Sequence, residues 1–213
     1  MMINRRRAYG GKKEDTYIQD GLVFWLDGIN KGNDPTAWTD LVGGIKFVWN
    51  NSVVVQNDHI DTTSITQSLV GDKSALFPTN SSTIEVVVSM PNNTNGIVFM
   101  GVANGNICFG MWDNTLGLTT APIVFHAQFY IFENNKIYSF SCSKSLVSQN
   151  KTNLSIVNSS YWSNADSNLY VGGRANNQLL FKGNIYCIRI YNRQLTEADV
   201  AYNYDIDRKR FNF

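Results

Sequence analysis

Short runs of apolar residues, separated by polar turns, recur along most of the chain. The runs are residues 21–26, 53–55, 74–77, 83–90, 97–102, 107–112, 123–132, 137–142, 154–157, 169–171 and 184–191. The separators, such as 92–96 and 104–106, are rich in Asn and Gly, which tolerate positive φ and are typical of hairpin turns. Strands at this spacing, without helices between them, indicate an all-β fold built as an antiparallel two-sheet jelly-roll sandwich.

One segment, residues 195–204, has the features of a helix instead. Thr196 is typical of an N-cap, and Glu197 and Asp199 fall in the first turn, where acidic side chains suit the helix dipole. Leu195 is placed to pack against Val200 as a hydrophobic staple. We expect one short C-terminal helix that caps the sandwich.

The chain divides into a basic N-terminal arm, residues 1–19, and one jelly-roll domain, residues 20–213. The arm carries a cluster of basic side chains, namely Arg5, Arg6, Arg7, Lys12 and Lys13. Over the whole chain 18 basic residues balance 17 acidic ones, so we expect no nucleic acid to bind the sandwich. The arm either pairs with an acidic protein surface or phosphates, or is a solvated tail.

Several sequence signals bear on the compartment. No apolar segment follows the arginines, and no apolar run approaches the roughly 20 residues of a membrane span, so we expect neither a secretion signal nor a membrane helix. Synthesis in the cytoplasm is therefore expected.

Cys108, Cys142 and Cys187 are odd in number and lie in apolar runs, which favours buried free thiols over a disulfide or a zinc site.

The C-terminal part of the chain resembles a known superfamily. Residues 168–174 (NLYVGGR) and 181–197 (FKGNIYCIRIYNRQLTE) resemble the closing hairpin and helix of the laminin-G-like, concanavalin A-like lectin/glucanase superfamily. Looser matches at residues 21–27, 38–40 and 82–88 extend the resemblance over about residues 21–204. The resemblance implies a jelly roll. It selects no single function, because the superfamily includes lectins, glycosidases, adhesion modules and virion proteins.

The last strand of this match alternates in polarity. Ile188 and Ile190 alternate with Arg189 and Tyr191. Since successive side chains of a strand point to opposite faces, we expect one face in the core and the other in solvent.

The carboxylates do not form a glycosidase pattern. Glycosidases of this superfamily carry Glu-x-Asp-x-x-Glu on one strand, because hydrolysis with retention needs two carboxyl groups about 5 Å apart. Strand 83–90 offers only Glu85, and Glu197 and Asp199 lie in the expected helix. No Gly-x-Ser-x-Gly nucleophile motif accompanies either histidine. We expect a protein without catalytic activity, and a glycoside hydrolase is the less favoured alternative.

Sugar binding is expected at aromatic side chains that have polar neighbours in loops. The candidates are Trp38, Trp112, Asp113, Asn114, Tyr161 and Trp162. Aromatic rings stack on the faces of sugar rings, while Asn and Asp bond the hydroxyls. The alternative for each tryptophan is a packing role in the core or at its rim.

One loop concentrates oxygen ligands that a calcium ion prefers. The candidates are Asp27, Asn30, Asn33 and Asp34. Their spacing differs from that of an EF-hand, and Asp, Asn and Gly are also the ordinary residues of loops. No other cofactor is expected.

These observations favour a lectin-like binding or attachment module. The resemblance and the lack of a secretion signal suggest a subunit of a bacteriophage virion, for example a head-decoration or tail-appendage protein, because lysis releases virions. In this hypothesis the arm contacts other virion or surface proteins in an oligomeric assembly, and the sandwich binds host or mucosal glycans in the virion or extracellular space. The alternative is a cell-surface carbohydrate-binding adhesion module.

Overall fold

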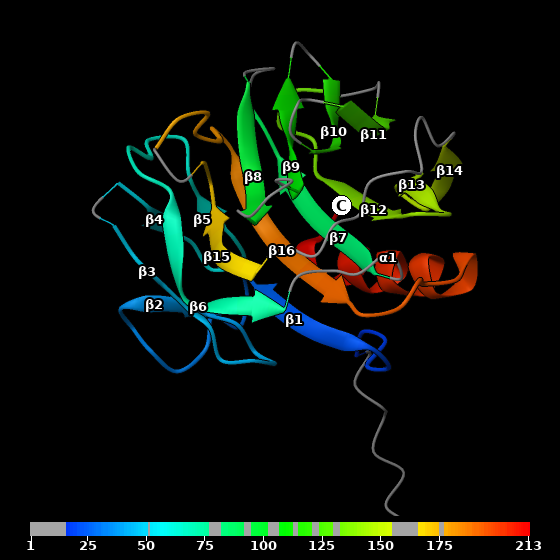
Figure 1. The fold of residues 1–213 in the computed structure, drawn as a ribbon, viewed down its shortest axis with the longest axis horizontal. Helices are drawn as coiled ribbons and strands as arrows, with labels where there is room; N and C mark the ends of the chain where they lie inside the picture. Colours follow the sequence, from blue (N-terminus) through cyan, green and yellow to red (C-terminus); the bar gives the residue numbers. More distant parts are fainter. Residues whose placement is uncertain are drawn as a thin grey trace, which may run out of the picture.

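The computed structural model describes residues 16–50, 52–76, 82–91, 95–101, 107–112, 115–120, 124–129, 133–154, 166–174 and 177–213 (Figure 1). Some strand residues within these ranges are described by their backbone alone. Within the described ranges, no helix is both long and apolar enough to cross a membrane.

Two antiparallel sheets face each other (Figure 1). The first sheet contains β1 (Leu22–Asp27), β4 (Val54–Val55), β5 (Ile60–Asp61), β7 (Thr83–Ser89), β12 (Tyr138–Ser143), β13 (Val147–Gln149), β14 (Thr152–Leu154) and β16 (Asn184–Tyr191). Its order is β14-β13-β12-β7-β16-β5-β4, and β1 also pairs with β16. The second sheet contains β2 (Ala37–Thr39), β3 (Lys46–Val48), β6 (Leu69–Leu76), β8 (Gly96–Gly101), β9 (Ile107–Trp112), β10 (Thr115–Thr120), β11 (Val124–Phe129) and β15 (Asp166–Val171). Its order is β11-β10-β9-β8-β15-β6-β3-β2.

The core fills the space between the two sheets. In β7, Ile84, Val86 and Val88 point inward and pack in one cluster with residues of the second sheet such as Phe47 and Phe99. This alternation is the period of two that a strand imposes on its side chains. Burying such side chains stabilises each by about 1.5–3 kcal/mol relative to exposure. The predicted all-β, two-sheet sandwich with a C-terminal helix is confirmed.

Two of the cysteines lie inside the sandwich or behind it. Cys142 belongs to the core between the sheets, and Cys187 lies on the opposite face of the first sheet. Both are buried free thiols, as the sequence predicts. The side chain of Cys108 lies outside the described residues.

A β-bulge interrupts the alternation of β16. The register against β7 shifts between Ile185 and Cys187. As a result Ile185 and Ile188 belong to the core between the sheets, while Tyr186 and Cys187 both belong to the cluster on the other face. The extra residue resets the phase of the strand, so that Arg189 points away from the core.

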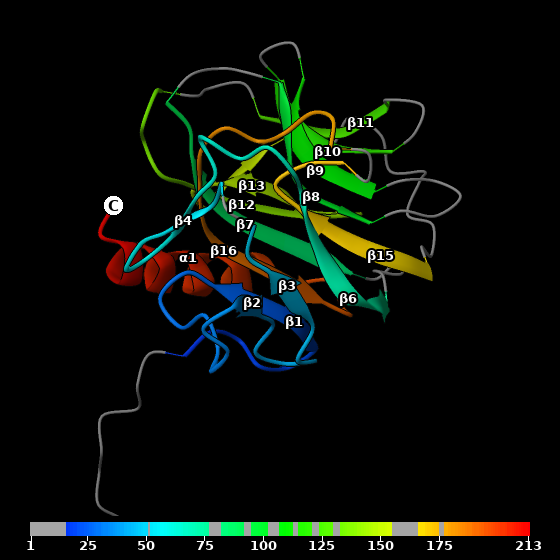
Figure 2. The same cartoon turned by 90° about the vertical axis from the view of Figure 1, so that its left-hand side faces the viewer.

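Helix α1 (Glu197–Phe211) covers that other face of the first sheet (Figure 2). Thr196 is the N-cap, as the sequence predicts, and the structure adds a capping box between Thr196 and Asp199. The helix continues beyond the expected end at residue 204, to Phe211, which packs against Val87, Tyr186 and Cys187. The central strands of the first sheet, β7, β12 and β16, are therefore buried on both faces.

The folded domain begins before residue 20. Tyr17 is only 2% exposed, and its hydroxyl donates to Asp207 Oδ1 of α1 at 2.8 Å. The Ile18 N–H donates to Asn203 Oδ1 at 3.0 Å. The expected boundary between arm and domain at residue 20 is corrected, because residues 16–19, expected in the arm, pack against α1.

Candidate functional site

Arg189 lies between the first sheet and α1, sealed from solvent. Its guanidinium forms a bidentate ion pair with Asp207 at 2.7 and 2.8 Å, and Nε donates to Glu85 Oε2 at 2.9 Å. The Tyr17 ring lies over the guanidinium, 3.9 Å from its centroid. Burial alone would lower the pKa of Arg189, but Asp207 and other neighbours hold it well above its usual range. The expectation that Arg189 and Tyr191 face solvent is wrong, because α1 covers them.

Glu85 and Asp207 are the two carboxylates that this arginine brings together. They are 3% and 0% exposed, so they do not line a cleft that a substrate could enter. Burial raises the pKa of Glu85 from its ordinary value of 4.5 to about 7, against the opposing effect of Arg189. The arrangement fastens the helix to the sheet.

The outer face of the second sheet differs, because described side chains on it reach solvent. Lys46 and Val48 of β3 flank the buried Phe47, and Val48 is 60% exposed. Val70 of β6 is 43% exposed and pairs in register with Tyr170 of β15, which is partly exposed. These three residues, Val48, Val70 and Tyr170, form what we call the apolar strip.

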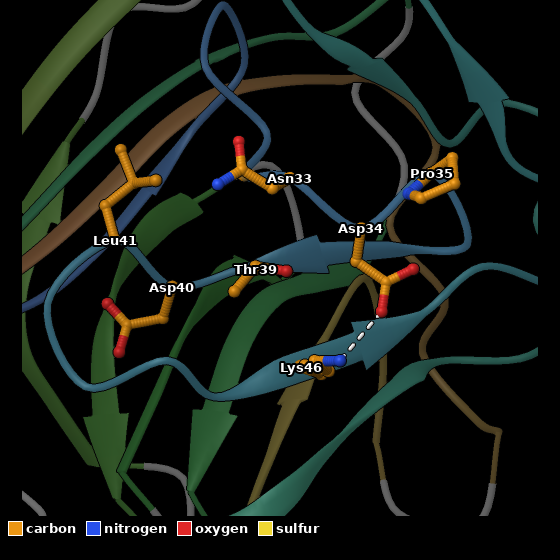
Figure 3. Close-up of a pocket in the computed structure, with 8 residues that line it drawn as sticks. Asn33, Asp34, Pro35, Thr39, Asp40, Leu41 and Lys46 are labelled. Carbon is orange, nitrogen blue, oxygen red and sulfur yellow. Dashed lines mark hydrogen bonds and ion pairs between the residues drawn. The ribbon is translucent and has the colours of Figure 1, made fainter.

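A pocket of about 570 Å³ opens on the same hairpin (Figure 3). It is lined by Gly32, Asn33, Asp34, Pro35, Thr39, Asp40, Leu41 and Lys46. The loop after β1 forms one wall, because the Thr39 N–H of edge strand β2 donates to Lys31 O at 2.9 Å. Gly32 has φ +87° and lies so close to Thr39 that a Cβ there would be 2.6 Å from Thr39 Cβ.

Asp34 and Lys46 face each other across the pocket (Figure 3). Lys46 Nζ lies 2.8 Å from Asp34 Oδ2, and Asp34 Oδ1 accepts from the Thr36 N–H and hydroxyl at 2.9 and 2.6 Å. These bonds, the one from Lys46 first, hold the pKa of Asp34 well below its usual range. The carboxylate is therefore ionised and fixed in position.

Two further polar groups lie at the base of the pocket. Asp40 is 1% exposed, and its carboxylate accepts from the backbone N–H groups of Trp25, Val42 and Gly43 at 2.7, 3.1 and 2.7 Å. Asp40 thus fixes the loop between β2 and β3. Within the part of the chain that the structure describes, buried Thr39 Oγ1 forms no hydrogen bond.

The structure corrects one sugar-binding candidate and leaves the others untested. Trp38 is fully buried and its Nε1 donates to Asp27 O at 3.1 Å, so its ring has no free face for a sugar. The side chain of Trp112 lies outside the described residues, as do Asp113, Asn114, Tyr161 and Trp162.

The candidate calcium ligands do not converge. Asp27 Oδ2 pairs with Arg210 on the α1 side, whereas Asp34 pairs with Lys46 in the pocket. Asn30 Oδ1 accepts from the Gly32 N–H at 3.3 Å. Both carboxylates already have a cation, and among the described residues no group of three His, Cys, Asp or Glu side chains is arranged to hold a metal. The expected calcium site in this loop is corrected accordingly.

The basic side chains of the arm, Arg5, Arg6, Arg7, Lys12 and Lys13, lie outside the described residues. Thr39, Lys46 and the apolar strip are not among the residues that the sequence predicts for the site. The alternation Lys46-Phe47-Val48 was the available signal, since it predicts a short strand with one exposed face.

Comparison with known proteins identifies a fold but no family. No protein-family model matches the chain, and no curated protein matches it. Among solved structures, Trypanosoma rangeli sialidase in complex with sialic acid superposes with a TM-score of 0.64 at 13% sequence identity, over 89% of this chain and 33% of the sialidase. The receptor-binding domain of botulinum neurotoxin D gives a TM-score of 0.64 at 11% identity, over 88% of this chain and 53% of that domain.

These likenesses concern the β-sandwich architecture. The chain spans about a third of the sialidase and about half of the toxin domain. At identities this low, the shared feature is the fold, and function has to be argued from the site.

Proposed function

We propose that the chain is a non-catalytic carbohydrate-binding module, and that the outer face of the second sheet holds the sugar. The observation that carries this proposal is the pocket of Asn33, Asp34 and Lys46 beside the exposed apolar strip. Sugars offer hydroxyl groups on their edges and apolar C–H groups on their faces. A site that combines charged hydrogen-bonding groups with apolar side chains suits both.

The absence of catalysis is supported by where the carboxylates lie. Glu85 and Asp207 are committed to Arg189 in the layer under α1. Asp34 is committed to Lys46, and its lowered pKa suits it poorly for the role of a general acid. The sialidase and toxin neighbours share the sandwich over part of their length, so the fold is compatible with a binding module, and the case for sugar binding rests on the pocket and the apolar strip.

The attachment role rests on where the two ends of this arrangement lie: the arm and the proposed sugar-binding face are on opposite sides of the sandwich. The segment that leads to the arm leaves beside α1, on the side of the sandwich away from the outer face of the second sheet (Figure 2). An arm that docks on one side leaves the sugar-binding side free. We therefore propose attachment to a larger assembly, with a bacteriophage virion as the first candidate and a cell surface as the alternative, and a glycan-rich host or mucosal surface as the target.

A glycan array probed with the full chain tests the binding function. We expect a restricted set of glycans to bind. Asp34→Asn should weaken binding about tenfold, because a hydrogen bond to a charged group is stronger than one to a neutral group. Tyr202→Ala, an exposed position on α1, serves as the control and should bind as the unaltered chain does. An array without hits, or full binding by Asp34→Asn, would contradict the proposed site.

A further inference from the structure

We infer that the ligand is a neutral oligosaccharide chain that runs from the pocket across the strands of the second sheet. This inference rests on the proposed carbohydrate-binding function and specifies its ligand class. The charges that line the pocket indicate that the ligand is neutral. The geometry of the apolar strip indicates that it is a chain of several sugar units.

The cation that lines the pocket is already neutralised by a carboxylate, which disfavours an anionic sugar. Its lining residues include two carboxylates, Asp34 and Asp40, and one ammonium, Lys46, so their formal charges sum to −1. Lys46 is already paired with Asp34 at 2.8 Å. A sialic acid or a uronic acid would bring a further carboxylate, which this arrangement repels and leaves unpaired.

The same groups suit neutral hydroxyls. A carboxylate has about four acceptor positions, and three at Asp34 are occupied by the Thr36 N–H, the Thr36 hydroxyl and Lys46. The remaining position can accept a hydroxyl. The exposed amide of Asn33 can donate to a neighbouring hydroxyl and accept from another.

The apolar strip extends this site over three strands. Phe47 pairs with Gly71, which places Val48 of β3 beside Val70 of β6, and Val70 pairs with Tyr170 of β15. Neighbouring strands lie about 4.8 Å apart, which is close to the length of one pyranose unit. A chain that crosses the strands can therefore place successive sugar rings over Val48, Val70 and Tyr170, where apolar contact and ring stacking favour binding.

Calorimetric titration of the full chain tests the inference. The probes are neutral tetrasaccharides (maltotetraose, cellotetraose, chitotetraose), their monosaccharides, and two anionic sugars (tetragalacturonate and sialyllactose). We expect at least one neutral tetrasaccharide to bind about tenfold or more tightly than its monosaccharide, because each further ring adds buried apolar area. Its affinity should not change as salt is raised, since no net charge is neutralised.

Two single substitutions test whether the apolar strip causes the tighter binding of the tetrasaccharide. Tyr170→Ala should reduce the advantage of the tetrasaccharide over the monosaccharide about tenfold, while Tyr202→Ala leaves it unchanged. Binding of the anionic sugars alone, or an affinity independent of chain length or of Tyr170, overturns the inference but leaves the carbohydrate-binding function standing. No binding of any probe here, together with an empty glycan array, overturns both.

Discussion

Arg189 shows how a charged residue can be buried completely and still be satisfied. Its donors meet Glu85 and Asp207, and the Tyr17 ring covers one face of its guanidinium. Two carboxylates surround one arginine here, so one negative charge is in excess inside a sealed layer. Burial destabilises that extra charge, and it therefore raises the pKa of Glu85 to about 7.

Replacing Glu85 by Gln should remove a pH dependence of stability. The folded chain keeps the Glu85 proton up to about pH 7, whereas the unfolded chain loses it near the ordinary pKa of 4.5. Between these values the folded state binds more protons, so the free energy of unfolding falls as pH rises, by on the order of 3 kcal/mol. Urea denaturation at a series of pH values measures this fall. Between about pH 4.5 and pH 7 the free energy of unfolding of Glu85→Gln should rise by that amount relative to the unaltered chain. Parallel pH profiles would refute the raised pKa.

The polarity pattern in the sequence predicted which way Arg189 points but not what covers it. Alternation distinguishes the two faces of a strand, and the covering of a face depends on a helix that arrives later in the chain. Trp38 is a similar case. A tryptophan beside a loop can be a sugar platform or a core residue, and the full burial of Trp38 together with its indole bond to Asp27 O assigns it to the core.

At the scale of elements, α1 was predicted well at its start and poorly at its end. Thr196 and Asp199 carry a local signal, the capping box, which needs only four consecutive residues. The last turns contain Asp207 and Phe211, which are buried through contacts with β16 and β12 that no local pattern reveals. The segment of residues 16–19 was missed for the same reason, since Tyr17 meets its partner 190 positions away.

Thr196→Ala should destabilise the chain by about 1 kcal/mol, the usual cost of losing an N-cap side chain. The hydroxyl of Thr196 accepts from the Asp199 N–H at 3.2 Å, and alanine leaves that donor to solvent. Chemical denaturation measures the difference. Thr196→Ser keeps the hydroxyl and should stay close to the unaltered chain, and equal losses in both variants would argue against the cap as the cause.

At the scale of the whole molecule, the two sheets have different environments. The central strands of the first are buried on both faces, between the core and α1, and the second presents Lys46, Val48, Val70 and Tyr170 to solvent. The sandwich itself followed from the spacing of apolar runs. The pocket did not, because it arises where the loop after β1 folds over the hairpin of β2 and β3.

Two truncations should separate attachment from folding. Removing residues 1–15 should leave stability unchanged and abolish incorporation into the assembly, which copurification with virions or cell envelopes measures. Removing residues 1–19 also deletes Tyr17, so it should lower the free energy of unfolding by about 3 kcal/mol or more, as other losses of buried aromatic side chains do. Normal incorporation of the shorter truncation would reject the arm as the anchor.

The bulge in β16 makes the phase of the strand as important as the identity of its side chains. If the same residues ran from Ile185 as a regular strand, the two-residue rhythm would turn Arg189 toward Phe140 and its neighbours, and would send Ile188 and Ile190 out beneath α1. One additional residue therefore lets a single strand give its isoleucines to the core and still place a charge under the helix.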